Sequence, residues 1–161
     1  SRLGRPRDHT RPGVYCEEAG EPLTTRFQAA QTINTAFLEA WTVSPGVLQT
    51  VVAFENTDLP ADEEWTAVHI EDNGAHQRTM GRRTERDVEN GASLIIDIHV
   101  ARGKDGIERA DALSQIAIAP FELTRLSGGI IFMAASIFHV GDWKSWYKVA
   151  IRIPFTYDRR V

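Results

Sequence analysis

The clearest hydrophobic pattern in the chain lies within Ser93–Ala119 and predicts a strand, a polar turn and a helix. From Leu94 to Val100 the residues at every second position are all apolar, which is typical of a strand with one face on a core. The glycine-containing Gly103–Gly106 segment predicts a turn. We expect the helix to fold back over the strand and to be stopped by Ser127-Gly128-Gly129. Its predicted core-facing stripe is Ile107, Ala110, Leu113, Ile116 and Ala117.

A second amphipathic pattern predicts a helix over about Thr25–Thr42. Thr25 and Gln28 have the spacing of a capping box, in which each side chain bonds the backbone of the other residue. The Ser44-Pro45-Gly46 segment ends the helix. Its predicted core-facing stripe is Phe27, Ala30, Ile33, Phe37 and Trp41.

Four further strands are predicted from runs rich in apolar and β-branched residues. They cover Val47–Phe54, Trp65–Ile70, Ile130–Phe138 and Trp146–Tyr157. Asp72-Asn73-Gly74 and Val140-Gly141-Asp142 are predicted turns. Pro154 cannot donate a ladder hydrogen bond, which favours an edge position or a bulge for the last strand.

This order of elements predicts an α+β fold with a mostly antiparallel sheet and two helices packed on one face. Residues 24–161 form the single expected domain, which suits a chain of 161 residues. The polar segment Ala75–Gly91 predicts a long charged hairpin loop. Residues 1–23 are rich in Arg, Pro and Gly and are expected to form an extended N-terminal arm.

The distribution of charge narrows the classes of partner. The formal net charge is −4, but the first eleven residues carry +3, which leaves −7 for the rest. Glu55–Asp72 holds seven acids and no Lys or Arg. An acidic body of this kind is not a general nucleic-acid binder, because phosphate neutralisation needs a basic surface. No apolar run approaches the roughly 20 residues that span a bilayer, and the single Cys16 excludes an internal disulfide and a cysteine-based zinc site.

Three sets of residues invite a chemical interpretation, and each departs from the pattern that its chemistry needs. His69 and His76, beside Glu71 and Asp72, match no standard zinc spacing. Ser136, His139 and Asp142 lack the elbow motif of a nucleophilic serine. Gly103–Gly106 has neither of the glycine spacings of phosphate-binding loops. We therefore expect no catalytic residue, metal or cofactor at these positions.

Charged and aromatic loops predict interfaces instead. An Arg-rich loop of one subunit could meet the acidic segment of the next in a ring built head-to-tail. A solvated loop is the equally weighted alternative. An aromatic cluster after the Gly141-Asp142 turn is a further interface anchor. The predicted interface residues are Arg78, Arg82, Arg83, Arg86, Glu55, Asp58, Glu63, Glu64, Trp143 and Trp146.

Taken together, the segments resemble the tail-terminator, or tail-completion, proteins of long-tailed bacteriophages. The resemblance covers about residues 24–158 and is one of order and pattern, without a decisive single motif. The segments that carry it are Thr25–Trp41, Phe54–Asp58, Trp65–Val68, Gly81, Leu94–Val100, Arg109–Ile116, Ile131–Ser136 and Trp146–Asp158. The family's opening motif is altered here to Phe54-Glu55-Asn56, and the N-terminal arm is longer than the family pattern.

The resemblance implies a structural virion protein in the tail or neck region, present in the host cytoplasm during assembly. Such a protein forms a homo-hexameric ring on the head-proximal end of the tail tube and meets a head-completion, or stopper, protein. Viral DNA passes through the lumen without sequence-specific binding, and the family implies no catalytic residue, cofactor or membrane contact. We expect Glu55–Asp72 to contribute to the lumen or to an inter-subunit contact. A tail tube or neck joining subunit, a small-ligand-binding domain or enzyme, and an adaptor that binds nucleic acid through the N-terminal arm are the alternatives.

Overall fold

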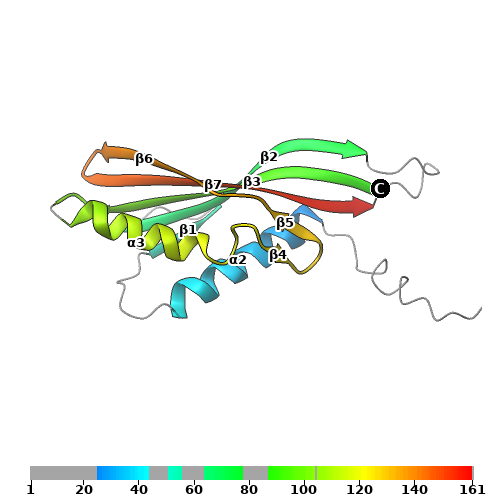
Figure 1. Ribbon diagram of the computed structural model, residues 1–161, viewed down its shortest axis with the longest axis horizontal. Coiled ribbons are helices and arrows are strands. Elements are labelled where there is room, and N and C mark those ends of the chain that lie inside the picture. The colour runs from blue at the N-terminus through cyan, green and yellow to red at the C-terminus, as the bar shows by residue number, and fades with distance from the viewer. Residues whose placement is uncertain (1–24, 44–50, 56–63, 78–86, 104, 161) are drawn as a thin grey trace, which may run out of the picture.

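The computed structural model describes residues 25–43, 51–55, 64–77, 87–103 and 105–160. Its seven strands form one sheet, and both helices lie on the same side of that sheet (Figure 1). All strand pairs are antiparallel except β1 (Val51–Phe54) with β2 (Trp65–Gln77). The fold is therefore the expected α+β arrangement. No helix in the described ranges has the length and apolar character needed to cross a membrane.

The described elements are two helices and seven strands of one sheet. The helices are α2 (Arg26–Val43) and α3 (Gly106–Ile118). The strands are β1 (Val51–Phe54), β2 (Trp65–Gln77), β3 (Asp87–Ala101), β4 (Arg125–Leu126), β5 (Ile130–Phe132), β6 (Ser136–Trp143) and β7 (Trp146–Arg160). The long strands β3 and β7 form the centre of the sheet, which has the order β1-β2-β3-β7-β5-β4 with β6 also beside β7.

The core lies between the helices and one face of β3 and β7. The predicted alternation of β3 is confirmed, since its even-numbered residues from Leu94 to Val100 are completely buried. The odd-numbered residues of β7 from Val149 to Tyr157 are also buried, with at most 4% of any residue exposed, as predicted. The apolar faces of these two strands and the apolar stripes of the two helices thus pack against each other in one core, which removes them from water.

Helix α2 has the predicted start and a different core face. The Thr25 amide donates to Oε1 of Gln28 at 3.0 Å and the Gln28 amide donates to Oγ1 of Thr25 at 3.2 Å, which confirms the capping box. The expected stripe is wrong at its first position, because Phe27 is 69% exposed. The helix instead buries one residue in every four: Ala29, Ile33, Phe37 and Trp41.

Helix α3 also departs from the prediction at both ends. Ile107 is 55% exposed, while Ala110, Leu113 and Ala117 are buried as expected. The helix ends at Ile118, whose carbonyl accepts hydrogen bonds from the amides of Phe121 and Glu122 at 2.9 and 3.0 Å. Pro120 has no amide to continue the helix. The predicted stop at 127–129 is wrong, because these residues form the turn between β4 and β5.

β2 and β3 form the predicted hairpin, and both strands extend into the segment Ala75–Gly91. Pairing extends to Gln77 opposite Val88, so the predicted turn at Asp72-Asn73-Gly74 is wrong. That segment is a bulge within β2, where the register shifts between Asp72 and Gly74. The link at 78–86 and the predicted arm at 1–23 lie outside the described residues.

The predicted strand Ile130–Phe138 is two strands, β5 and β6, which both pair with β7. Pro154 of β7 lies opposite the gap between them, so its missing donor coincides with an interruption of the neighbouring strand. The edge position, one of the two alternatives predicted from Pro154, is wrong, since β7 pairs with β3 on the other side, and the register of that pairing shows no bulge at Pro154. The turn expected at 140–142 is also wrong: those residues belong to β6, and the chain reverses at Lys144-Ser145.

Candidate assembly surface

Two of the predicted interface acids hold the subunit itself together. Oε1 of Glu55 accepts a hydrogen bond from the Ile70 amide at 2.8 Å and lies 3.6 Å from the guanidinium of Arg26. Glu64 lies 2.8 Å from Nε of Arg109 on α3. These contacts tie the start of each helix to the edge of the sheet at β1 and β2. Their predicted role between subunits stays a prediction, as does their place in a lumen.

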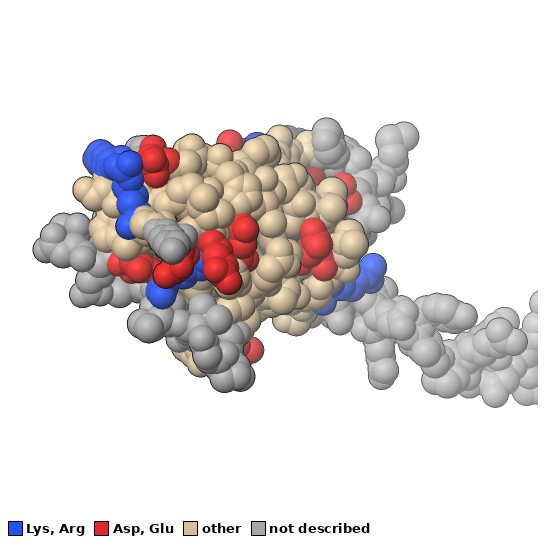
Figure 2. Space-filling model, turned by 60° about the vertical axis from the view of Figure 1, so that its left-hand side comes forward, with Lys and Arg blue, Asp and Glu red and all other residues tan. Residues whose placement is uncertain are grey.

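The other predicted interface residues are mostly beyond the described structure. Trp146 opens β7 and is half-buried, with Trp143 as its cross-strand neighbour in β6. The Trp143 side chain lies outside the description. Six more residues lie outside the described ranges: Asp58, Glu63, Arg78, Arg82, Arg83 and Arg86. Figure 2 shows Asp and Glu side chains in separate groups on one face, with broad areas of other residues between them.

The serine–histidine–aspartate set does not come together. Ser136 aligns with Arg152 and His139 with Val149, so the serine and histidine point to opposite faces of the sheet. Nδ1 of His139 lies 3.2 Å from the Tyr147 hydroxyl, and its Nε2 lies 3.6 Å from Asp111. Asp142 pairs with Arg102 at 3.0 Å, and both side chains are exposed. This geometry does not assemble a nucleophile, a base and an orienting acid.

The other two chemical candidates also have structural descriptions. Among the described residues, no group of three or more His, Cys, Asp or Glu side chains is placed to hold a metal ion. The His76 side chain is outside that set. The Gly103–Gly106 segment is the predicted turn, in which the Gly106 amide donates to the Gly103 carbonyl at 3.1 Å. A Cβ at Gly106 would lie 2.8 Å from the Ala101 carbonyl oxygen, so this position requires glycine for close packing.

The face of the sheet away from the helices carries one buried titratable ring. His99 is 1% exposed and stacks on Trp65, with 3.7 Å between ring centroids. Burial lowers the pKa of His99 below its ordinary value of 6.5, and the Lys148 cation lowers it further, while Asp97 acts in the opposite direction. The folded chain therefore favours the neutral imidazole.

We expect the free energy of unfolding to fall as the pH drops below 6.5, because the unfolded chain then binds a proton that folded His99 resists. The loss stops at the lowered pKa of the folded state. Urea denaturation between about pH 7.5 and pH 5.5 measures this slope. His99→Phe keeps a ring on Trp65 and should flatten this slope, whereas Phe27→Ala at an exposed position without a titratable group should not. Equal slopes in all three proteins would contradict the assignment.

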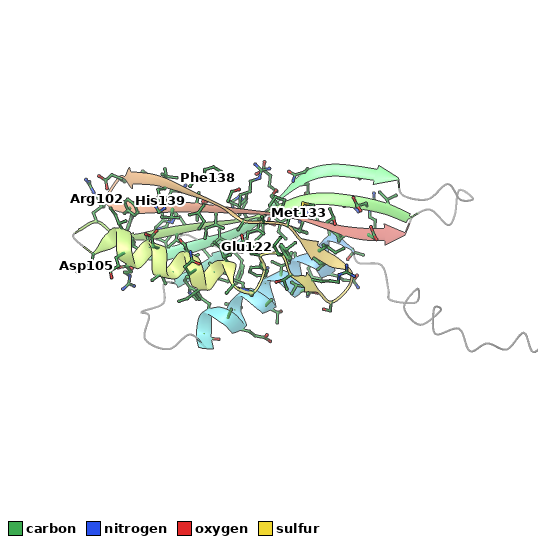
Figure 3. The ribbon with its side chains drawn as sticks, viewed as in Figure 1. Arg102, Asp105, Glu122, Met133, Phe138 and His139 are labelled. Atoms are coloured by element: carbon green, nitrogen blue, oxygen red, sulfur yellow. The ribbon has the colours of Figure 1, made fainter. Side chains whose placement is uncertain are left out.

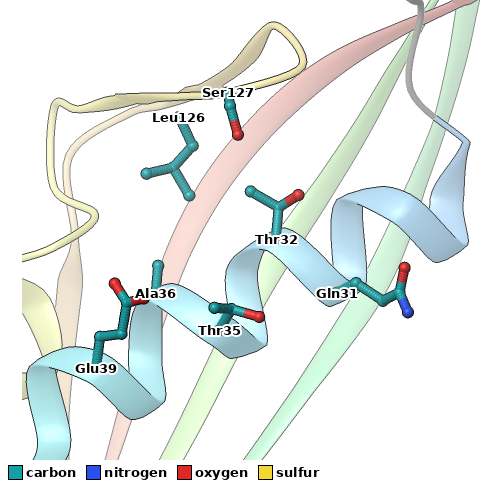
Figure 4. A pocket seen from close by; sticks show the side chains of 7 residues that line it. All are labelled: Gln31, Thr32, Thr35, Ala36, Glu39, Leu126 and Ser127. Carbon is teal, nitrogen blue, oxygen red and sulfur yellow. The ribbon is translucent and has the colours of Figure 1, made fainter.

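Two hollows lie on the helix side of the described surface. The larger, of about 520 Å³, is open and lies between α2 and the turn after β4 (Figure 4). Its lining is mostly polar: Gln31, Thr32, Thr35, Ala36, Glu39, Leu126 and Ser127. The smaller, of about 240 Å³, lies between the start of α3 and the β6–β7 hairpin, beside the Arg102–Asp142 pair. Neither holds a convergent set of catalytic groups.

The most unusual surface feature is an apolar margin along one side of the sheet. β6 pairs with β7 alone, and within the described part of the chain its other side has no strand beside it. Six large apolar side chains lie on β5, β6 and the adjoining loops and are between 36% and 76% exposed. We call them the β6 margin: Leu123, Ile131, Met133, Ile137, Phe138 and Val140.

Two members of the β6 margin that lie in separate parts of the sequence are joined through the backbone. The Leu123 amide donates to the Met133 carbonyl at 3.2 Å, and the Met133 amide donates to the Pro154 carbonyl at 2.9 Å. Phe138 aligns with Ala150 on the face away from the helices (Figure 3). Soluble monomers rarely leave a strand edge both unprotected and apolar, because such an edge invites pairing with another chain.

The sequence prediction missed this margin. It recognised the apolar character of Ile130–Phe138 but assigned one strand there and ended it with a turn at 140–142. The signal that was available is the Gly141-Asp142 pair, which suits a bulge within a longer strand as well as a turn. Exposure of the strand depends on the strand order, which the local pattern does not contain.

No protein-family model and no curated protein sequence matches the chain. Among solved structures, one similar protein has a name that describes no function. It is 15% identical, with a TM-score of 0.47, and the match covers 79% of this chain and 94% of that protein. Similarity at this level carries no argument about function.

Proposed function

We propose that the chain is a structural subunit of a phage tail, a tail terminator that forms a ring on the head-proximal end of the tail tube. The observation that carries this proposal is the β6 margin, an exposed apolar strand edge on an otherwise well-packed two-layer domain. A surface of this kind is suited to subunit contacts. The choice of the tail-terminator family within this class of subunits rests on the order and pattern of the segments in the sequence.

The partners follow from the same proposal. One face of the ring meets the tail tube protein and the other meets the head-completion protein, and viral DNA passes through the centre. The acidic balance of the chain supports this role, since a net charge of −4 does not favour retention of a polyanion. The protein then acts in the virion, after assembly in the host cytoplasm.

The decisive experiment adds the purified chain to terminator-free tail tubes from the same phage and images them by negative-stain electron microscopy. We expect one ring at one end of each tube and an arrest of tube growth. Incorporation along the whole tube would identify a tube subunit instead. Binding to the head-completion protein without binding to the tube would identify a neck joining protein. Absence of contact with either partner would overturn the proposal.

A further inference from the structure

The strand register identifies which part of a second copy fits the β6 margin. Five strands lie side by side in the order β1, β2, β3, β7 and β6, so β1 and β6 are the two ends of the described sheet at this level. One row of aligned residues crosses all five: Val52, Thr66, Ile98, Val149 and His139. The two ends therefore lie directly opposite each other across the subunit.

The chain directions at these two ends are complementary. β1 runs parallel to β2, and each following pair across to β6 is antiparallel. β6 therefore runs opposite to β1. When a second copy is placed beside the first in the same orientation, its β1 meets β6 as an antiparallel pair, the more stable kind.

The residue types at the two ends also match. β1 consists of four apolar residues, Val51–Phe54, and β6 presents exposed Phe138 and Val140. Pairing would cover these side chains and the outer backbone groups of β6 with a strand of similar character. The alternative is a two-fold contact of β6 with β6, which closes at two copies.

We infer that β6 of one copy pairs antiparallel with β1 of a second copy, which extends the sheet from subunit to subunit. The contact is head-to-tail, so it leaves each new copy with a β6 margin for the next, and it gives a closed ring when the rotation from one copy to the next closes on itself. This inference rests on the proposed ring-forming function and assigns the surfaces that make the ring.

Cysteine cross-linking tests the pairing. In a Cys16→Ser background, Val52→Cys and His139→Cys place thiols on the two ends of the aligned row. A short thiol-specific cross-linker should give dimers, trimers and larger products up to a closed ring only when both cysteines are present. Val52→Cys with Phe27→Cys, at an exposed site on α2 away from β6, is the matched control and should give no ladder.

Three results would overturn the inference. Dimers from His139→Cys alone would show that β6 meets β6. Intact rings without cross-links would show that another surface joins the subunits, and end-capping of tail tubes by the same protein would leave the proposed function standing. If the chain stays monomeric and forms no cross-links, both at high concentration and on tail tubes, the inferred strand pairing is wrong. If cross-linked rings form but do not cap tubes, the strand pairing is supported and the proposed terminator function is wrong.

Discussion

Phe37→Ala is expected to lower the free energy of unfolding by about 3–5 kcal/mol, because it removes a large aromatic side chain from a close-packed core. Phe37 is completely buried and stacks on Trp41, with 5.1 Å between ring centroids. It belongs to the stripe by which α2 contacts the sheet. Guanidinium or urea denaturation of the folded chain measures the change as a shift of the midpoint.

Phe27→Ala on the same helix is the matched control. Phe27 is exposed at the first turn of α2, so its truncation should change the free energy of unfolding by less than about 0.5 kcal/mol. The stripe predicted from the sequence contains both phenylalanines, whereas the buried stripe in the structure contains only Phe37. Comparing the two variants therefore tests which stripe packs on the sheet. Equal losses in the two variants would mean that α2 packs with a different face toward the sheet.

The features of the fold that could be predicted are those encoded by neighbouring residues. The capping box needs only Thr25 and Gln28, three residues apart. The buried faces of β3 and β7 need only alternation along each strand. In α2, however, both Phe27 and Ala29 fit a helical stripe with Ile33 and Phe37, and the sheet alone determines which of them is covered.

The turns were the main source of error, for one physical reason. Glycine beside Asp or Asn permits a chain reversal and a β-bulge equally well. At Asp72–Gly74 and at Gly141-Asp142 the chain continues as a strand with a shifted register. The true β6–β7 turn contains Lys144 at a φ of 53°, a conformation that lysine adopts less readily than glycine. Only the partner strand distinguishes these possibilities, and the sequence does not identify the partner.

The interface expected from charged loops stays a prediction. Within the subunit, the described acids Glu55 and Glu64 contact the Ile70 amide and Arg109. The exposed surface suited to assembly is apolar and follows from the position of β6 beside β7 alone. An apolar strand has the same sequence pattern in a core and at an edge, so strand order had to be known first.

The combined replacement of Phe138 and Val140 by Lys is expected to prevent ring formation and to leave the subunit folded. Both side chains are more than half exposed, so the fold loses little when they change. Each side chain is already nearly half covered within the subunit, so covering the rest at an interface contributes about 1–1.5 kcal/mol each. Their loss, with two ammonium groups to desolvate in addition, should weaken each subunit contact by about 30- to 100-fold. Sedimentation velocity measures the assembly, and the thermal unfolding midpoint checks the fold.

Phe27→Lys with Leu38→Lys provides the matched control, because it adds the same charge at two exposed apolar sites on α2. This variant should assemble as the unmodified chain does. If both double variants fail to form rings, the effect is due to net charge. If both still form rings, the β6 margin is not part of the assembly surface. Loss only at the β6 margin separates a local edge contact from general repulsion, since lysine on an open edge strand is the means by which monomeric β proteins avoid such contacts.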